Sequence, residues 1–126
     1  MTNLIFTGDF APTHNNFELS QNIINLFSDN YLCINLEGVI TNKEKRDDKK
    51  GVALSLDCSL LKELLSDNLI CGVNNNHIMD YGKDGLEDTI NYFNENNIQY
   101  FGAGRNIDDF KKIQKLNINN KKIIIL

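Results

Sequence analysis

The chain has 126 residues, of which 41% are hydrophobic and 24% are charged, with one proline and a formal net charge of −4 at pH 7. This length suits one small domain, and the composition excludes a disordered or fibrous chain. The net negative charge argues against nucleic acid as a partner, because non-specific nucleic-acid binding depends on clustered Lys and Arg.

Short β-type runs alternate along the chain with segments of helical period. Strands are predicted at Asn3–Thr7, Tyr31–Asn35, Leu69–Val73, Ile98–Phe101 and Lys122–Leu126. Apolar residues spaced three and four apart predict helices that contain Leu19–Phe27, Leu60–Leu65, Leu86–Phe93 and Ile107–Ile113. This alternation is typical of βαβ units, so the expected fold class is α/β with a mainly parallel sheet.

Two of the predicted helices have recognisable start signals. Asp84 is followed three residues later by Glu87, the spacing of a capping box. Asn106 can cap the helix that begins at Ile107, because an asparagine side chain accepts hydrogen bonds from the first free amides of a helix. Both signals support the alternation of strands and helices.

Two segments do not follow the alternation. Residues 38–58 fit neither period and are predicted to form a long loop with a short strand near Val52–Leu56. The chain ends on the apolar run Ile123–Leu126, which is predicted to form a strand inside the sheet with uncovered apolar surface nearby. We therefore expect residues 1–126 to be the amino-terminal portion of a single, longer domain.

The sequence shows no sign of a membrane span or a disulfide framework. No run approaches the roughly 18 apolar residues that a membrane span requires, and Met1 is not followed by a signal segment. Cys33, Cys58 and Cys71 form no CxxC pair, and their odd number suits a reducing compartment. Cys33 and Cys71 lie in apolar runs and are expected in the core. The chain as given is expected to be cytoplasmic.

Polar residues follow the predicted strands, where ligands bind in open α/β sheets. Asp9 follows the first strand, Glu37 the second, and Asn76 and His77 the third. Carboxylate, amide and imidazole groups that meet at one edge are the ligands that divalent Mn, Fe or Zn accept. Two carboxylates placed close together also need a cation, since otherwise one of them takes a proton. The sequence therefore predicts a metal site formed by these residues at one edge of the sheet.

Each of these residues also has a plain structural interpretation. Asp9 could cap a turn, and Glu37 could face solvent. The asparagines could be ordinary loop residues, and His77 alone is more often a hydrogen-bonded structural histidine than a catalytic one. Their joint placement after three successive strands is what favours a shared site.

Four segments carry a resemblance to a known family. They are Gly8-Asp9, Asn35–Gly38, Asn75–Gly82 with Gly85, Leu86 and Thr89, and Gly102–Gly104 with Asn106. In this order they resemble bacterial capsule-synthesis proteins of the CapA and poly-γ-glutamate synthesis type, which are related to calcineurin-like metallophosphoesterases. The stretch NNHxxDYG followed by GLxxT is the specific part of the resemblance, which covers nearly the whole chain. The resemblance implies the amino-terminal part of an αββα sandwich.

The resemblance implies a two-metal phosphoesterase-type site and a partnership with the capsule or polyglutamate synthesis machinery. Asp9 resembles the ligand on the first strand, Glu37 the bridging carboxylate, and Asn76 a ligand of the second metal. His77 resembles the residue that steadies the transferring phosphoryl group. Two cations can activate a water and stabilise the charge on the attacking and leaving oxygens, and an imidazole can protonate the leaving oxygen.

The sequence departs from the broader phosphoesterase pattern in two places. Ala11 stands where a ligand histidine would follow the first aspartate, and His14, the nearest imidazole, could be a shifted ligand. No histidine follows His77, so we expect little activity from this chain in isolation. A catalytically silent binding or assembly module on the same scaffold is the alternative. A haloacid-dehalogenase-type phosphatase would use Asp9–Thr13 but needs a second aspartate at the position of Ala11.

Overall fold

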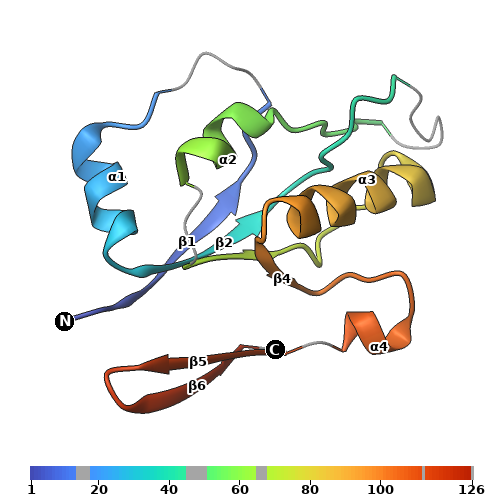
Figure 1. Cartoon of the computed structure of the whole chain (residues 1–126). Helices are drawn as coiled ribbons and strands as arrows, with labels where there is room; N and C mark the ends of the chain where they lie inside the picture. Colours follow the sequence, from blue (N-terminus) through green and yellow to red (C-terminus); the bar gives the residue numbers. More distant parts are fainter. Residues whose placement is uncertain (14–17, 45–50, 65–67, 112, 126) are drawn as a thin grey trace.

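The computed structural model describes residues 1–13, 18–44, 51–64, 68–111 and 113–125. In chain order the elements are β1 (Leu4–Phe10), α1 (Gln21–Ser28), β2 (Tyr31–Leu36), α2 (Cys58–Leu64), β3 (Leu69–Gly72), α3 (Gly82–Glu95), β4 (Gln99–Phe101), α4 (Ile107–Phe110), β5 (Gln114–Ile118) and β6 (Lys121–Ile125). Strands β1 to β4 form one sheet in sequence order, and each neighbouring pair is parallel (Figure 1). The predicted α/β class with a mainly parallel sheet is confirmed.

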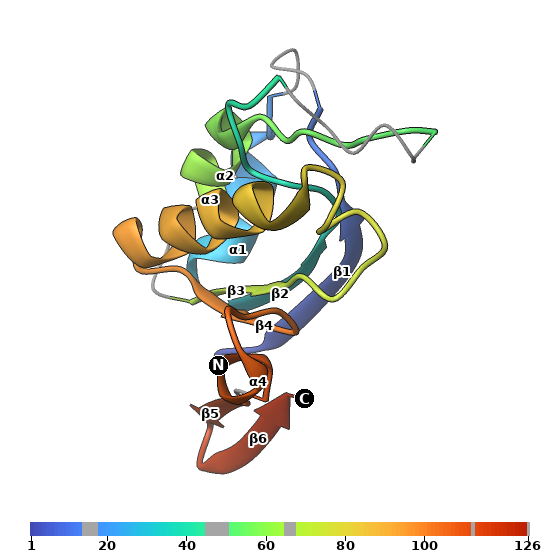
Figure 2. The ribbon, with the colours of Figure 1, turned by 90° about the vertical axis from the view of Figure 1, so that its right-hand side faces the viewer.

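Helices α1, α2 and α3 cover one face of the parallel sheet (Figure 2). Alternate side chains of β2 point to this face, and Leu32, Ile34 and Leu36 are buried there. They share a core with Leu61 of α2 and Phe93 of α3. Burying one large apolar side chain stabilises a fold by about 1.5–3 kcal/mol, so this layer is the main source of stability.

The β5–β6 hairpin lies against the opposite face of the sheet (Figure 2). Leu116, Ile118 and Ile125 of the hairpin are buried in a second cluster. This cluster also contains Cys33 of β2 and Ile70 of β3, which point away from the helices. The expected burial of Cys33 and Cys71 is confirmed, one thiol on each side of the sheet.

The place of the final strand corrects the sequence-based prediction. Residues 121–125 do form a strand, but β6 pairs antiparallel with β5 and not with the parallel sheet. Asn119 and Asn120 connect the two strands with φ of 50° and 64°, the left-handed conformation that a tight hairpin turn needs. A two-residue turn can join only antiparallel neighbours, because a parallel neighbour requires a crossover of about a dozen residues. Leu126 lies outside the described residues.

Part of the face that carries the hairpin is uncovered. Phe6 of β1 is the register partner of Cys33 and therefore points to this face. Phe6 is nevertheless 64% exposed. Ile124 of β6 is 58% exposed on the outer side of the hairpin, since Ile123 and Ile125 on either side of it pack toward the sheet. Apolar surface thus remains accessible at the edge of this layer.

The predicted capping box at the start of α3 is wrong. The helix begins at Gly82, so Asp84 lies within its first turn and Tyr81 occupies the cap position. The turn before the helix explains the earlier start, because the Gly82 amide already donates to the Met79 carbonyl at 3.0 Å. Asp84 at this position still favours the helix, since a negative charge near a helix amino terminus is stabilising.

The predicted cap of α4 is confirmed, although the helix is shorter than expected. The Asn106 side chain accepts hydrogen bonds from the Asp108 and Asp109 amides at 2.9 and 3.0 Å. The helix ends at Phe110, and Ile113 lies before β5 instead of on the helix. A longer helix would include residues of β5 and would remove their hydrogen bonds to β6.

The short strand expected near residues 52–56 is wrong. In the described part of this segment the structure has a single parallel bridge between Val39 and Ser55. Two backbone hydrogen bonds of 2.9 Å flank it, from the Val39 amide to the Leu54 carbonyl and from the Leu56 amide to the Val39 carbonyl.

Among the helices within the described residues, none has the length and apolar character needed to cross a membrane.

Candidate functional site

A β-bulge in β1 sets the direction of Asp9. The strand continues past Asp9 instead of ending before it, and its register pairs Phe6 with Cys33 and Asp9 with Asn35. β1 therefore has one more residue than β2 over this interval, and the extra position includes Gly8 with a φ of 78°, a value that favours glycine. Because side chains alternate along a strand, the bulge turns Asp9 to the face of Phe6. There Asp9 Oδ1 accepts a hydrogen bond from Asn35 Nδ2 at 2.7 Å.

The carboxyl groups of Asp9 and Glu37 meet at the ends of β1 and β2. Glu37 directly follows β2, and its amide donates to the Phe10 carbonyl at 3.0 Å, which holds it beside β1. The hydrogen bond with Asp9 raises the pKa of Glu37, and burial and the charge of Asp9 raise it further. The hydrogen bond from Asn35, followed by that with Glu37, lowers the pKa of Asp9. The closeness of the two carboxyls thus favours the protonated form of Glu37 and the ionised form of Asp9 relative to isolated side chains.

His77 lies in the turn after β3 and faces a carboxyl group on each side. Its Nε2 is 3.7 Å from Glu37 Oε1. Its Nδ1 is 2.7 Å from Asp80 Oδ2, and Asp80 is only 1% exposed. The imidazole therefore connects the end of β2 with a buried carboxyl group in the turn before α3.

Asn75 fixes this turn onto the end of β2. Its Nδ2 donates to the Leu36 carbonyl at 2.8 Å and to Asn35 Oδ1 at 3.4 Å. Its Oδ1 accepts from the His77 amide at 3.0 Å. Asn35 and Asn75 were predicted only as members of the family motif, whereas in the structure they orient Asp9 and His77. Asn76 lies in the same turn and is exposed to solvent.

The structure brings Asp9, Glu37 and His77 together at the carboxyl-terminal edge of the parallel sheet. Within the residues that the structure describes, no group of three or more His, Cys, Asp or Glu side chains is arranged to hold a metal ion. Ligation by Asp9, Glu37 and Asn76 therefore stays a prediction. His14, the possible shifted ligand, lies outside the described residues. The two crowded carboxyls nevertheless suit a divalent cation, which would offset the repulsion between their charges.

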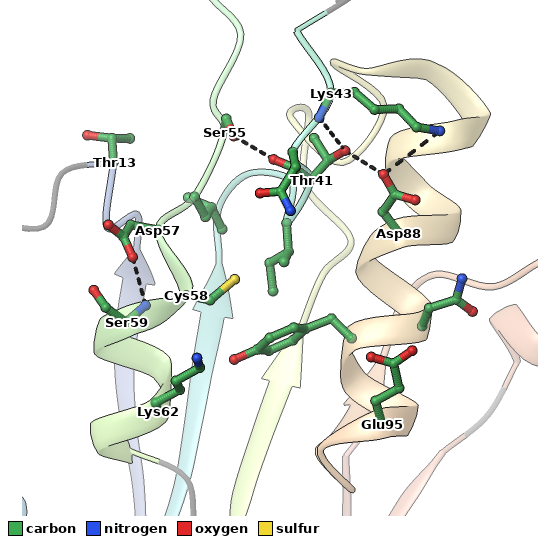
Figure 3. Close-up of a pocket in the computed structure, with 15 residues that line it drawn as sticks. Thr13, Thr41, Lys43, Ser55, Asp57, Cys58, Ser59, Lys62, Asp88 and Glu95 are labelled. Carbon is green, nitrogen blue, oxygen red and sulfur yellow. Dashed lines mark hydrogen bonds and ion pairs between the residues drawn. The ribbon is translucent and has the colours of Figure 1, made fainter.

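A separate polar pocket of about 1110 Å³ opens between α2 and α3 on the helix-covered side of the sheet (Figure 3). The charged residues that line it are Lys43, Asp57, Lys62, Asp88 and Glu95. Lys43 Nζ lies 3.8 Å from Asp88 Oδ2, so part of this charge is neutralised internally. None of the predicted site residues lines the pocket. Its lining comes from helices and loops distant in sequence, which no local motif indicates.

Comparison with known proteins identifies related sequences. The family model described as bacterial capsule synthesis protein PGA_cap matches residues 4–126. A capsule biosynthesis protein CapA from Bacillus anthracis is 30% identical over 105 residues, which cover 80% of this chain and 26% of the relative. A PGA biosynthesis protein CapA from Bacillus subtilis (strain 168) is 34% identical over 92 residues, which cover 69% of this chain and 24% of the relative. The chain thus spans about a quarter of the length of these relatives.

Proposed function

The chain belongs to the family of bacterial capsule synthesis proteins described as PGA_cap, and on this basis we propose that Asp9, Glu37 and His77 form part of a divalent-metal-dependent phosphoesterase-type site. The site would act in capsule or poly-γ-glutamate biosynthesis. The observation that carries the proposal is the adjacent pair of carboxyls, Asp9 and Glu37, with the His77 imidazole 3.7 Å from Glu37.

Each residue has a role that its position supports. Asp9 and Glu37 would hold the cation, with Asn76 as a further ligand, and carboxylate and amide oxygens suit divalent Mn, Fe or Zn. A cation bound there would activate a water and stabilise negative charge on a phosphoryl group. His77 presents Nε2 to the same place, where a protonated imidazole can donate to a leaving oxygen.

The chain alone offers few donors for such a site. Two carboxylates and one amide are fewer ligands than two metal ions normally share. We therefore expect the isolated chain to bind divalent metal weakly and to hydrolyse a generic phosphodiester slowly or not at all. The activity of a whole capsule synthesis protein would need donors beyond those named here.

Calorimetric titration with manganese chloride tests the proposal, together with hydrolysis of a chromogenic phosphodiester. Asp9→Asn and Glu37→Gln remove one charge each with little change in shape, and both should weaken manganese binding. Glu18→Gln is the matched control, because it removes an exposed charge elsewhere and should leave binding unchanged. Equal effects of all three substitutions would show that net charge alone attracts the metal and would overturn the site. Rapid turnover by the wild-type chain would contradict the expected shortage of donors.

A catalytically silent binding or assembly module is the second candidate. The observation that favours it is the pocket of about 1110 Å³ that lies apart from the proposed site. Under this alternative, Asp9→Asn and Glu37→Gln leave manganese binding unchanged. A short poly-γ-glutamate, chosen because one relative carries the name PGA biosynthesis protein, would instead bind in the pocket. Its affinity would fall in Lys62→Gln, since Lys62 is a cationic lining residue.

A further inference from the structure

Asp80 is a buried carboxyl group in the turn that carries His77. The residue is 1% exposed, and burial of a charged or polar group is costly unless it is hydrogen-bonded. Its Oδ2 accepts a hydrogen bond from the Leu54 amide at 2.9 Å. An amide N–H can only donate, so this oxygen acts as an acceptor.

The same oxygen is 2.7 Å from His77 Nδ1. An ionised carboxylate has only acceptor sites, so the simplest assignment has Nδ1 carrying the hydrogen. A neutral imidazole has one donor and one acceptor nitrogen. A hydrogen on Nδ1 therefore leaves Nε2 as the free acceptor, and Nε2 is the atom that faces Glu37 at 3.7 Å.

These contacts form a closed ring of residues. The Val39 amide, two residues after Glu37, donates to the Leu54 carbonyl at 2.9 Å. The Leu54 amide donates to Asp80, Asp80 contacts His77, and His77 returns to Glu37. The ring joins three segments that are distant in sequence, and Asp80 is its only buried carboxyl group among the contacts described. Removal of the Asp80 carboxyl would leave the His77 ring and the Leu54 amide without this shared acceptor.

We propose that Asp80 is a positioning residue that fixes the tautomer and orientation of His77, so that Nε2 points to the carboxyl pair. The catalytic reason for this positioning rests on the proposed function, whereas the positioning itself is argued only from the contacts of Asp80. A partner that orients a histidine in this way is a recurrent requirement of metal and acid–base sites, because the second nitrogen decides what the first can do.

The test is nitrogen-15 NMR of the histidine rings in the whole chain at about pH 8, where an ordinary histidine is neutral. His77→Gln and His14→Gln assign the two imidazoles. The wild-type chain should show the hydrogen of His77 on Nδ1. Asp80→Ala removes both acceptor oxygens and should lose this fixed tautomer while circular dichroism shows a retained fold. Asp84→Ala, at an exposed acid in the next turn, is the matched control and should leave His77 unchanged.

A wild-type His77 with its hydrogen on Nε2, or an unchanged tautomer in a folded Asp80→Ala variant, would overturn the inference. If Asp80→Ala does not fold, the wild-type tautomer alone decides. Paramagnetic broadening of the His77 signals by manganese tests the proposed function separately. Lack of broadening with the expected tautomer would remove the metal site and leave the positioning role of Asp80 intact.

Discussion

Thr89 of α3 anchors the segment that follows Glu37, and its replacement gives a sharp test of how this segment is held. The side chain is fully buried, and its hydroxyl accepts a hydrogen bond from the Ile40 amide at 3.0 Å. The same hydroxyl donates to the Gly85 carbonyl at 2.9 Å, one turn earlier in the helix. Thr89 therefore links α3 by hydrogen bonds to Ile40, three residues after Glu37.

Thr89→Val and Thr89→Ser separate the hydrogen bond from the packing. Valine keeps the shape but leaves the buried Ile40 amide without its acceptor, which costs about 1–3 kcal/mol. Serine keeps the hydroxyl and removes one methyl group, which costs about 0.5–1.5 kcal/mol by analogy with other single-methyl deletions in cores. We therefore expect Thr89→Val to be the less stable variant, even though it conserves the side-chain volume.

Urea denaturation followed by far-ultraviolet circular dichroism measures both free energies of unfolding, with equal slopes as the condition for comparing them. Thermal midpoints should follow the same order, at about 3–6 °C per kcal/mol for a chain of this size. Lower stability of Thr89→Ser than of Thr89→Val would refute the reasoning, because methyl packing would then outweigh the hydrogen bond to Ile40.

Three further predictions follow from the described contacts. Gly85→Ala should destabilise the chain by up to about 3 kcal/mol, because the new Cβ would lie 2.9 Å from Val39 Cγ1. The better helix propensity of alanine offsets only about 1 kcal/mol, and a net gain in thermal midpoint would contradict the close packing. The raised pKa of Glu37 stabilises the fold at low pH, and this contribution is lost as pH rises from about 4.5 through the folded-state pKa. In metal-free buffer near pH 7, Glu37→Ala should therefore unfold at the same temperature as the wild type or higher; a clear loss would mean that Glu37 has a structural partner other than Asp9. Leu116→Ala should cost about 2–5 kcal/mol in urea denaturation if the hairpin unfolds together with the sheet, and a much smaller loss would show that it opens separately.

Sequence periodicity was sufficient for the parallel sheet and for the approximate place of its four strands, whereas β5 was not predicted. The runs around Leu32 and Ile70 are apolar because both faces of these central strands are buried, and that pattern is local. The asparagine cap of α4 was also readable, since a cap involves only residues within three positions of each other. The order of polar residues after the strands indicated an edge at which Glu37 and His77 now lie close together.

Only the tertiary structure decided how that edge is built. The bulge at Gly8 that turns Asp9, the contact of Asn75 with the end of β2, and the burial of Asp80 depend on segments 26 or more residues apart. The pairing of β6 with β5 likewise followed from a tight turn at Asn119 and not from the apolar run itself. Periodicity shows which face of a helix or strand is buried, because several residues along that face are apolar together. Register, bulges and long-range hydrogen bonds depend instead on which neighbour packs there, and that is settled only when the chain is folded.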